Sequence, residues 1–194
     1  MTRAALFLDR DDTIVRDLGY IGNPDQITLL PGVADALRKA AAAFRLYLVT
    51  NQSGIGRGYY TLAEAEACNR RTLELLELPP PGFHGICIAP ERPDQPSRYR
   101  KPSPAYVLER IEADGLDPAR CHVIGDKRSD IECGLAADVG AILVGLPDGN
   151  YRPDALDYAH AHDVPCFPGL PEAIDHVLDI ETRRPTQCGD DSSE

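Results

Sequence analysis

Ala4-Ala5-Leu6-Phe7-Leu8-Asp9-Arg10-Asp11-Asp12-Thr13 is a short apolar run followed at once by carboxylates. The run predicts a buried strand, and ligands of open parallel sheets bind beyond the carboxyl ends of the strands. On extended backbone, Asp9 and Asp11 face the same side. Such a pair can bind a hard divalent cation, or one member can be an acid while the other attacks. Aspartates after a strand are also common turn and capping residues, so the pair alone leaves both interpretations open.

Three further segments follow apolar runs or carry cations. Thr50 to Gly58 combines a hydroxyl and amides with glycines, a composition that can cradle a phosphate. Arg100-Lys101-Pro102 adds two cations, and Gly125-Asp126-Lys127-Arg128-Ser129-Asp130 adds carboxylates after another apolar run. Each segment alone has a structural explanation as a turn, a solvated pair or a helix cap. Their order along the chain favours a phosphate-handling site.

This order resembles the four motifs of the haloacid dehalogenase superfamily of phosphohydrolases, over about residues 4 to 145. Within it, the chain is similar to the histidinol-phosphatase and heptose-bisphosphate-phosphatase subfamily, through Asp9-Arg10-Asp11, Thr50 to Gly58 and Arg100 to Pro102. Asp17 to Tyr20, Leu30 to Val33 and Gly58 to Thr61 resemble the heptose branch. The resemblance implies that the substrate lies against Asp17, Leu18, Gly19, Tyr20, Asn51, Gln52, Ser53, Arg57, Arg100 and Lys127.

A chemical assignment follows from what a phosphate ester needs: charge neutralisation, an aligned nucleophile and a proton for the leaving group. We expect Asp9 to be the nucleophile and Asp11 the acid and base. Magnesium would be held by Asp9, Asp126 and the carbonyl of Asp11, with Asp130 behind them. Thr50, Arg100 and Lys101 would bond the transferring oxygens.

Two positions depart from the subfamily. Asp12 stands where members usually have Gly, and on extended backbone its side chain would point away from the site. Relatives often bind zinc through four Cys and His ligands, whose places are taken here by Ala89, Glu91, Ser97 and Tyr99. We therefore predict no zinc, and a loop over residues 90–99 stiffened by prolines.

Alternating strands and helices predict a three-layer α/β Rossmann-like sandwich with a mainly parallel sheet and no large cap domain. We expect strands over 4–8, 46–49, 84–89, 121–124 and 141–144, and helices over 33–43, 61–77, 103–115, 129–137 and 171–181. One phosphatase domain would cover residues 1–181. Residues 182–194 are polar and predict a disordered tail.

Composition limits the partners. The net charge of -11 argues against a nucleic-acid partner, because such binding depends on neutralising phosphates. No apolar stretch approaches the roughly 20 residues that cross a bilayer, and no signal-peptide pattern is present, so we expect a cytoplasmic protein without a membrane partner. We expect a monomer or weak homodimer.

The sequence therefore predicts a magnesium-dependent phosphomonoesterase that forms an aspartyl-phosphate and acts on a small phosphorylated sugar, most similar to the heptose branch. Histidinol phosphate is the alternative substrate. A non-catalytic module that binds phosphorylated ligands is the alternative outside enzymes.

Overall fold

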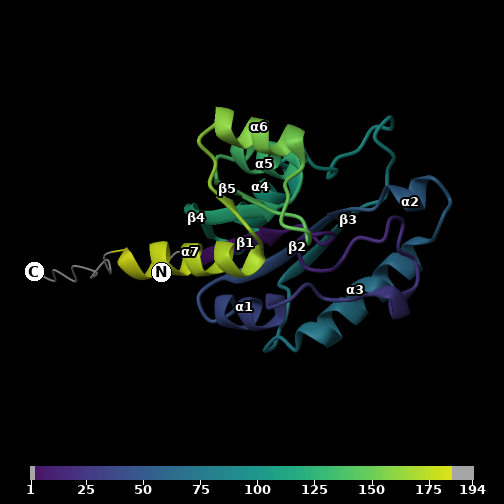
Figure 1. Ribbon diagram of the computed structural model, residues 1–194, viewed down its shortest axis with the longest axis horizontal. Coiled ribbons are helices and arrows are strands. Elements are labelled where there is room, and N and C mark those ends of the chain that lie inside the picture. Colours follow the sequence, from purple (N-terminus) through teal and green to yellow (C-terminus); the bar gives the residue numbers. More distant parts are fainter. Residues whose placement is uncertain (1–2, 185–194) are drawn as a thin grey trace, which may run out of the picture.

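Six parallel strands form one sheet in the computed structural model, which describes residues 3–184 (Figure 1). The strand order is β3-β2-β1-β4-β5-β6. The bounds are β1 Arg3–Leu8, β2 Arg45–Asn51, β3 Gly85–Ala89, β4 Leu116–Gly125, β5 Gly140–Val144 and β6 Cys166–Phe167. The predicted parallel α/β sheet is confirmed.

Helices cover both faces of this sheet (Figure 1). One face packs against α1 (Val33–Ala40), α3 (Leu62–Leu76) and α7 (Leu170–Arg183). The other packs against α4 (Ala105–Asp114), α5 (Arg128–Ala136) and α6 (Pro153–Ala161). The side chains of β1 alternate between the two faces of the sheet. Leu6 and Leu8 pack on the face covered by α1, α3 and α7, and Phe7 packs on the other face.

The connections contain little structure of their own. A 3-10 turn, η1 (Pro24–Gln26), lies between β1 and α1, and the short α2 (Ser53–Gly56) follows β2. A Thr61–Glu64 capping box begins α3, as its sequence predicts. Among residues 3–184 there is no separate cap domain, and no helix is both long and apolar enough to cross a membrane.

Some elements differ from those predicted. β6 and α6 were not expected, and β4 begins at Leu116 rather than near residue 121. The last helix continues to Arg183, past the predicted start of the tail, of which residues 185–194 lie outside the described part of the chain.

The strand order determines where ligands can bind. From β1 the chain adds β2 and β3 on one side, and β4, β5 and β6 on the other. The carboxyl ends of β1 and β4 therefore lie at a topological switch point, where helices on opposite faces leave a crevice. Asp9 and Asp126 directly follow these two strands, and Thr50 lies near the end of β2.

Candidate active site

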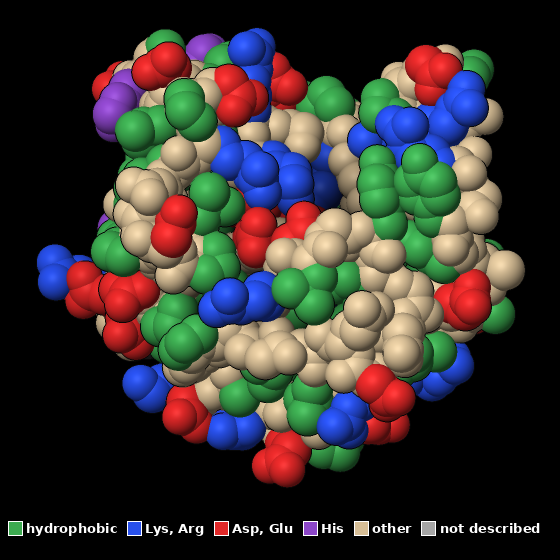
Figure 2. Space-filling view, turned by 45° about the vertical axis from the view of Figure 1, so that its right-hand side comes forward, with side chains coloured by type: hydrophobic (Ala, Val, Ile, Leu, Met, Phe, Trp, Pro, Cys, Tyr) green, Lys and Arg blue, Asp and Glu red, His purple; other side chains and the backbone are tan. Residues whose placement is uncertain are grey.

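A cavity of about 340 Å³ opens at the switch point, and we call it the Asp9 cavity. On the face turned forward in Figure 2, a hollow is lined by Lys and Arg side chains with carboxylates beside them. The residues that line the Asp9 cavity are Asp9, Arg10, Asp11, Asp17, Gly19, Tyr20, Asn51, Gln52, Ser53, Tyr60, Arg100, Lys101, Lys127 and Ser129. Four of them are cations, in a chain whose net charge is -11. An anionic ligand matches this concentration of positive charge.

Asp9 lies between two ammonium groups. Its Oδ1 is 2.8 Å from Lys101 Nζ, and its Oδ2 is 3.3 Å from Lys127 Nζ. Burial alone would raise the pKa of Asp9, but the two lysines hold that pKa well below its usual range. Asp9 is therefore a carboxylate at neutral pH, the form in which an aspartate can act as a nucleophile.

Lys101 is buried and links three parts of the site. Besides Asp9, its Nζ contacts Asp130 Oδ1 at 2.6 Å and donates to the Val49 carbonyl at 2.7 Å. Burial opposes its charge, yet Asp130 and Asp9 raise the pKa of Lys101. Because Asp130 is occupied by Lys101 and by the backbone N–H of Lys127, it serves to hold the lysines.

Asp126, Asp9 and Asp130 together could hold a metal ion. One carboxylate oxygen from each of the three lies within 4.8 Å of the other two. Burial raises the pKa of Asp126 to about 7, against the charge of Lys127. Lys127 Nζ lies 3.3 Å from both Asp126 Oδ1 and Asp9 Oδ2. An ammonium thus stands where a cation could bridge the two carboxylates, so their oxygens fit a hard divalent ion such as magnesium.

Asp11 is held from both sides. Arg10 Nε donates to its Oδ1 at 3.0 Å, and Gln52 Nε2 donates to its Oδ2 at 2.8 Å. Arg10 is fully buried and also donates to Asn69 of α3 at 3.0 Å, while Tyr60 donates to Gln52 Oε1 at 2.6 Å. The network fixes Asp11 at the cavity wall, accepting hydrogen bonds at both carboxylate oxygens.

Thr50 is buried beside Asp11. Its Oγ1 accepts a hydrogen bond from Gln52 Nε2 at 2.7 Å. Because this bond uses the hydroxyl as an acceptor, the hydroxyl proton remains available for an anionic oxygen.

Asn51 makes two hydrogen bonds to the backbone of Lys101. Its Nδ2 donates to the Lys101 carbonyl and its Oδ1 accepts from the Lys101 N–H, each at 3.0 Å. The amide thus uses both its donor and its acceptor on Lys101, and Asn51 also lines the Asp9 cavity, where the sequence predicts a substrate contact.

The loop over residues 90–99, predicted to be stiffened by prolines, is held by side-chain hydrogen bonds. Ser97 donates to Glu91 Oε2 at 2.7 Å, and the Arg100 N–H donates to Ser97 Oγ at 3.1 Å. Tyr99 donates to Glu109 Oε2 at 3.0 Å, and Ala89 ends β3. Glu91, Ser97 and Tyr99 are thus engaged with protein groups, and none of the four positions offers a thiolate or imidazole, so they do not fit a zinc ion.

The other predicted substrate residues divide into two groups. Asp17, Gly19, Tyr20, Gln52, Ser53, Arg100 and Lys127 line the Asp9 cavity. Leu18 and Arg57 are not among its lining residues: Leu18 is 58% exposed, and the Arg57 guanidinium lies 6.0 Å from the Tyr20 ring.

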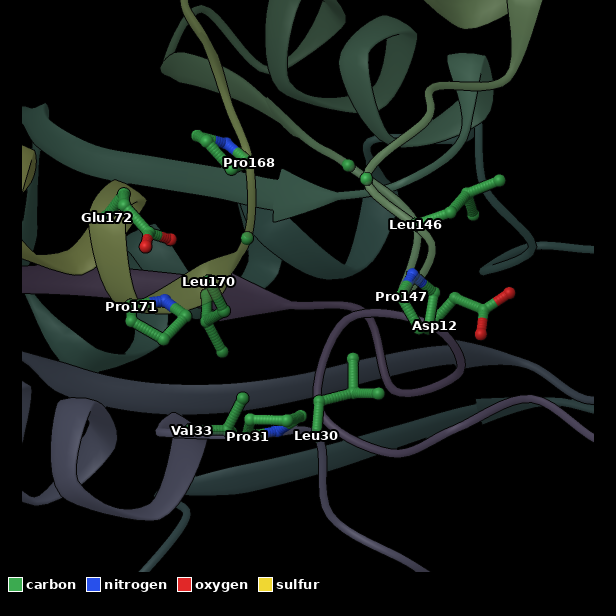
Figure 3. Close-up of a pocket in the computed structure, with 13 residues that line it drawn as sticks. Asp12, Leu30, Pro31, Val33, Leu146, Pro147, Pro168, Leu170, Pro171 and Glu172 are labelled. Atoms are coloured by element: carbon green, nitrogen blue, oxygen red, sulfur yellow. The ribbon is translucent and has the colours of Figure 1, made fainter.

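The backbone expected at Asp12 is wrong. Its φ is 57°, in the left-handed region, instead of extended. Asp12 is absent from the Asp9 cavity and lines a second cavity of about 220 Å³, whose other walls are mostly apolar (Figure 3). Figure 3 shows its carboxylate directed away from Leu30, Pro31 and Val33. The positive φ explains why glycine suits this position.

Sequence reasoning missed several residues of the site. Arg10, Tyr60 and Ser129 line the Asp9 cavity, and Asn69 holds Arg10 from α3. Arg152, which precedes α6, contacts Asp126. Arg10 was signalled by its place between Asp9 and Asp11, and Tyr60 by following the glycine-rich loop. Nothing in the sequence signals the pairing of Arg152 or Asn69.

Comparison with known proteins agrees with the geometry. The family model described as HAD-hydrolase-like matches residues 98–173. A D-glycero-beta-D-manno-heptose-1,7-bisphosphate 7-phosphatase from Helicobacter pylori is 38% identical over 143 residues, covering 71% of this chain and 81% of that protein. The protein of that name from Escherichia coli K12 is 33% identical, over 88% of this chain and 93% of its own length.

Solved structures show the same fold. A D,D-heptose 1,7-bisphosphate phosphatase from B. bronchiseptica, complexed with magnesium and phosphate, aligns with a TM-score of 0.78 and 23% identity, covering 91% of this chain and 99% of that one. A putative HAD-like phosphatase from Mesorhizobium loti aligns with a TM-score of 0.71 and 32% identity, covering 93% of this chain and 87% of that one.

The fold, the site and these relatives define an enzyme that hydrolyses phosphoric monoesters. The chain belongs to the haloacid dehalogenase superfamily, in its histidinol-phosphatase and heptose-bisphosphate-phosphatase subfamily.

Proposed function

We propose that this enzyme removes the 7-phosphate of D-glycero-D-manno-heptose 1,7-bisphosphate, with magnesium, through an aspartyl-phosphate. The observation that carries the proposal is Asp9, a buried carboxylate between Lys101 and Lys127 at the wall of a cation-lined cavity. Relatives of 31–38% identity that bear this activity in their names support the choice of sugar.

The first half-reaction begins at Asp9. A carboxylate oxygen attacks phosphorus, the bond from phosphorus to the sugar oxygen breaks, and the departing oxygen takes a proton from Asp11. In the structure Asp11 accepts from Arg10 and Gln52, which hold its carboxyl group at the cavity wall. Thr50 and Lys101 stabilise the transferring oxygens.

The second half-reaction returns the enzyme to its starting state. Asp11, now a carboxylate, takes a proton from water as that water attacks phosphorus, and the bond to Asp9 breaks to release inorganic phosphate. Arg10 and Gln52 hold the Asp11 carboxylate in place for this step through the hydrogen bonds that they donate.

Asp9 and Asp126 would hold magnesium, with the carbonyl of Asp11 as a further ligand. When bound, the ion neutralises the carboxylates and polarises the phosphoryl group. Asp130 remains engaged with Lys101 and the backbone of Lys127.

The test measures phosphate release with magnesium from both anomers of heptose 1,7-bisphosphate, from fructose 1,6-bisphosphate and from histidinol phosphate. Asp9→Asn serves as the blank, because it retains shape and removes the nucleophile. Preference for one heptose anomer, lost in Asp9→Asn, is expected. Preference for histidinol phosphate would reassign the substrate, and binding of phosphate esters without turnover would favour a non-catalytic module.

A further inference from the structure

Arg152 joins two carboxylates that are far apart in the sequence. It is the residue before α6, and its Nε donates to Asp126 Oδ2 at 2.6 Å. Its Nη2 donates to Asp12 Oδ2 at 3.1 Å. One guanidinium therefore bridges the carboxylate that follows β4 and the Asp12 carboxylate of the first motif.

Arg152 contacts only one of the two carboxylate oxygens of Asp126. Arg152 takes Oδ2, while Oδ1 faces Lys127 Nζ, which also contacts Asp9. The side chain of Asp126 is fully buried, whereas that of Arg152 is 34% exposed. Arg152 thus fixes the rotation of a buried carboxylate from the solvent side and leaves its other oxygen facing the ammonium that also contacts Asp9.

Asp12 anchors the outer end of Arg152. Its own position is fixed, because its Oδ1 accepts from the Asp17 N–H at 3.0 Å and its N–H donates to the Val15 carbonyl at 2.7 Å. A left-handed φ is less favourable at an aspartate than at a glycine. The two hydrogen bonds at the Asp12 carboxylate offset that cost, and the charge of Arg152 neutralises the carboxylate.

The loop that carries Arg152 is itself ordered by hydrogen bonds. The Leu146 N–H donates to the Asn150 carbonyl at 2.7 Å, and the Gly145 N–H donates to the Phe167 carbonyl at 2.9 Å. The backbone that carries Arg152 is therefore held in place by these hydrogen bonds.

We propose that Arg152, held by Asp12, is a positioning residue that orients Asp126 for magnesium, and that Asp12 and Arg152 act as a pair. The inference rests on the magnesium site of the proposed function. Partners that orient metal-binding side chains typically contribute about 10- to 100-fold to metal affinity.

Calorimetric titration of the metal-free chain with MgCl2 tests the role of Arg152 directly, because it measures magnesium affinity without turnover. Arg152→Ala should weaken magnesium binding about 10-fold or more. Arg152→Lys retains the charge but cannot bridge both carboxylates, so it should recover only part of the affinity. Arg128→Ala is the matched control, since Arg128 pairs with Glu132 and packs over Tyr158 beside the same helix without touching the site.

A double-mutant cycle tests the pairing. Asp12→Gly should weaken binding less than Arg152→Ala does, because the contact between Arg152 and Asp126 remains. In the double variant the loss of magnesium affinity should be smaller than the product of the two single losses, because the effects of substitutions at contacting residues are not additive in free energy. Thermal unfolding of each metal-free variant verifies that it folds.

If the unaltered chain binds magnesium, either of two results would overturn the inference about Arg152. One is an Arg152→Ala affinity equal to that of Arg128→Ala, and the other is a double variant whose loss is the product of the single losses. If the unaltered chain binds no magnesium, the metal dependence of the proposed function fails as well, and the two failures are thereby distinguished.

Discussion

Asn51 and Lys101 form a two-way clamp, in which the side-chain amide of Asn51 both donates to and accepts from the backbone of Lys101, each at 3.0 Å. The clamp ties the end of β2 to the segment that carries the lysine beside Asp9. We therefore expect Asn51 to act on the reaction through the position of Lys101.

Asn51→Asp should lower kcat about 10-fold or more and change KM by less than about threefold, because the new oxygen repels the Lys101 carbonyl and misplaces the lysine. Steady-state kinetics on the preferred substrate provides the measurement, with Asn150→Asp in an exposed loop as control. A rise in KM at constant kcat would show instead that Asn51 binds substrate.

Lys101→Met should destabilise the metal-free protein by about 3–5 kcal/mol, since it leaves Asp9 and Asp130 as buried carboxylates without their ammonium. Urea unfolding at pH 7 measures the free energy of unfolding. Lys39→Met is the control, because Lys39 is exposed and lies 3.9 Å from the exposed Asp175. Equal losses in both variants would refute the role given to Lys101.

The purified protein should contain less than stoichiometric zinc by elemental mass spectrometry, and a chelator of zinc should leave its thermal midpoint unchanged. The hydrogen bonds of Ser97 to Glu91 and Arg100 stabilise the loop in place of a metal, so Ser97→Ala should cost about 1 kcal/mol. One zinc per chain after purification without added metal would contradict the prediction.

His122 should make the protein less stable in acid. Burial, followed by the charges of Arg184 and His176, lowers the pKa of His122 to about 4, from 6.5. A lowered histidine pKa stabilises the fold above 6.5, and this contribution is lost as the pH falls toward 4. His122→Gln removes the titration. The wild type should therefore lose on the order of 2 kcal/mol more than the variant between pH 7 and pH 4 in urea unfolding, and parallel curves would disprove this.

The strands that carry chemistry were predictable from the sequence because each is a short apolar run that ends in polar residues. Asp9, Thr50 and Asp126 follow or end such runs, and the parallel arrangement brings those ends to one edge. The position of these polar residues at the ends of apolar runs therefore indicated that they line or border the Asp9 cavity.

Other features depend on contacts that local pattern does not contain. β6 has two residues, too few for any periodicity, and α6 carries polar residues that masked its helical start at Pro153. Alternation suggested extended backbone at Asp12, but the chain turns there with positive φ. Arg152 meets Asp12 across 140 positions, a pairing that only the packed fold creates.

That separation along the chain also has a consequence for biosynthesis. The first carboxylates leave the ribosome long before Asp126, Lys127 and Arg152, whose strand and helix complete the crevice. A nascent chain that ends before Asp126 contains Asp9 and Lys101 but lacks Lys127, the second ammonium beside Asp9, and Arg152, which contacts Asp126. We therefore expect catalytic competence to come late in synthesis, with no turnover of phosphate esters before the segment that carries Asp126 and Lys127 has been made.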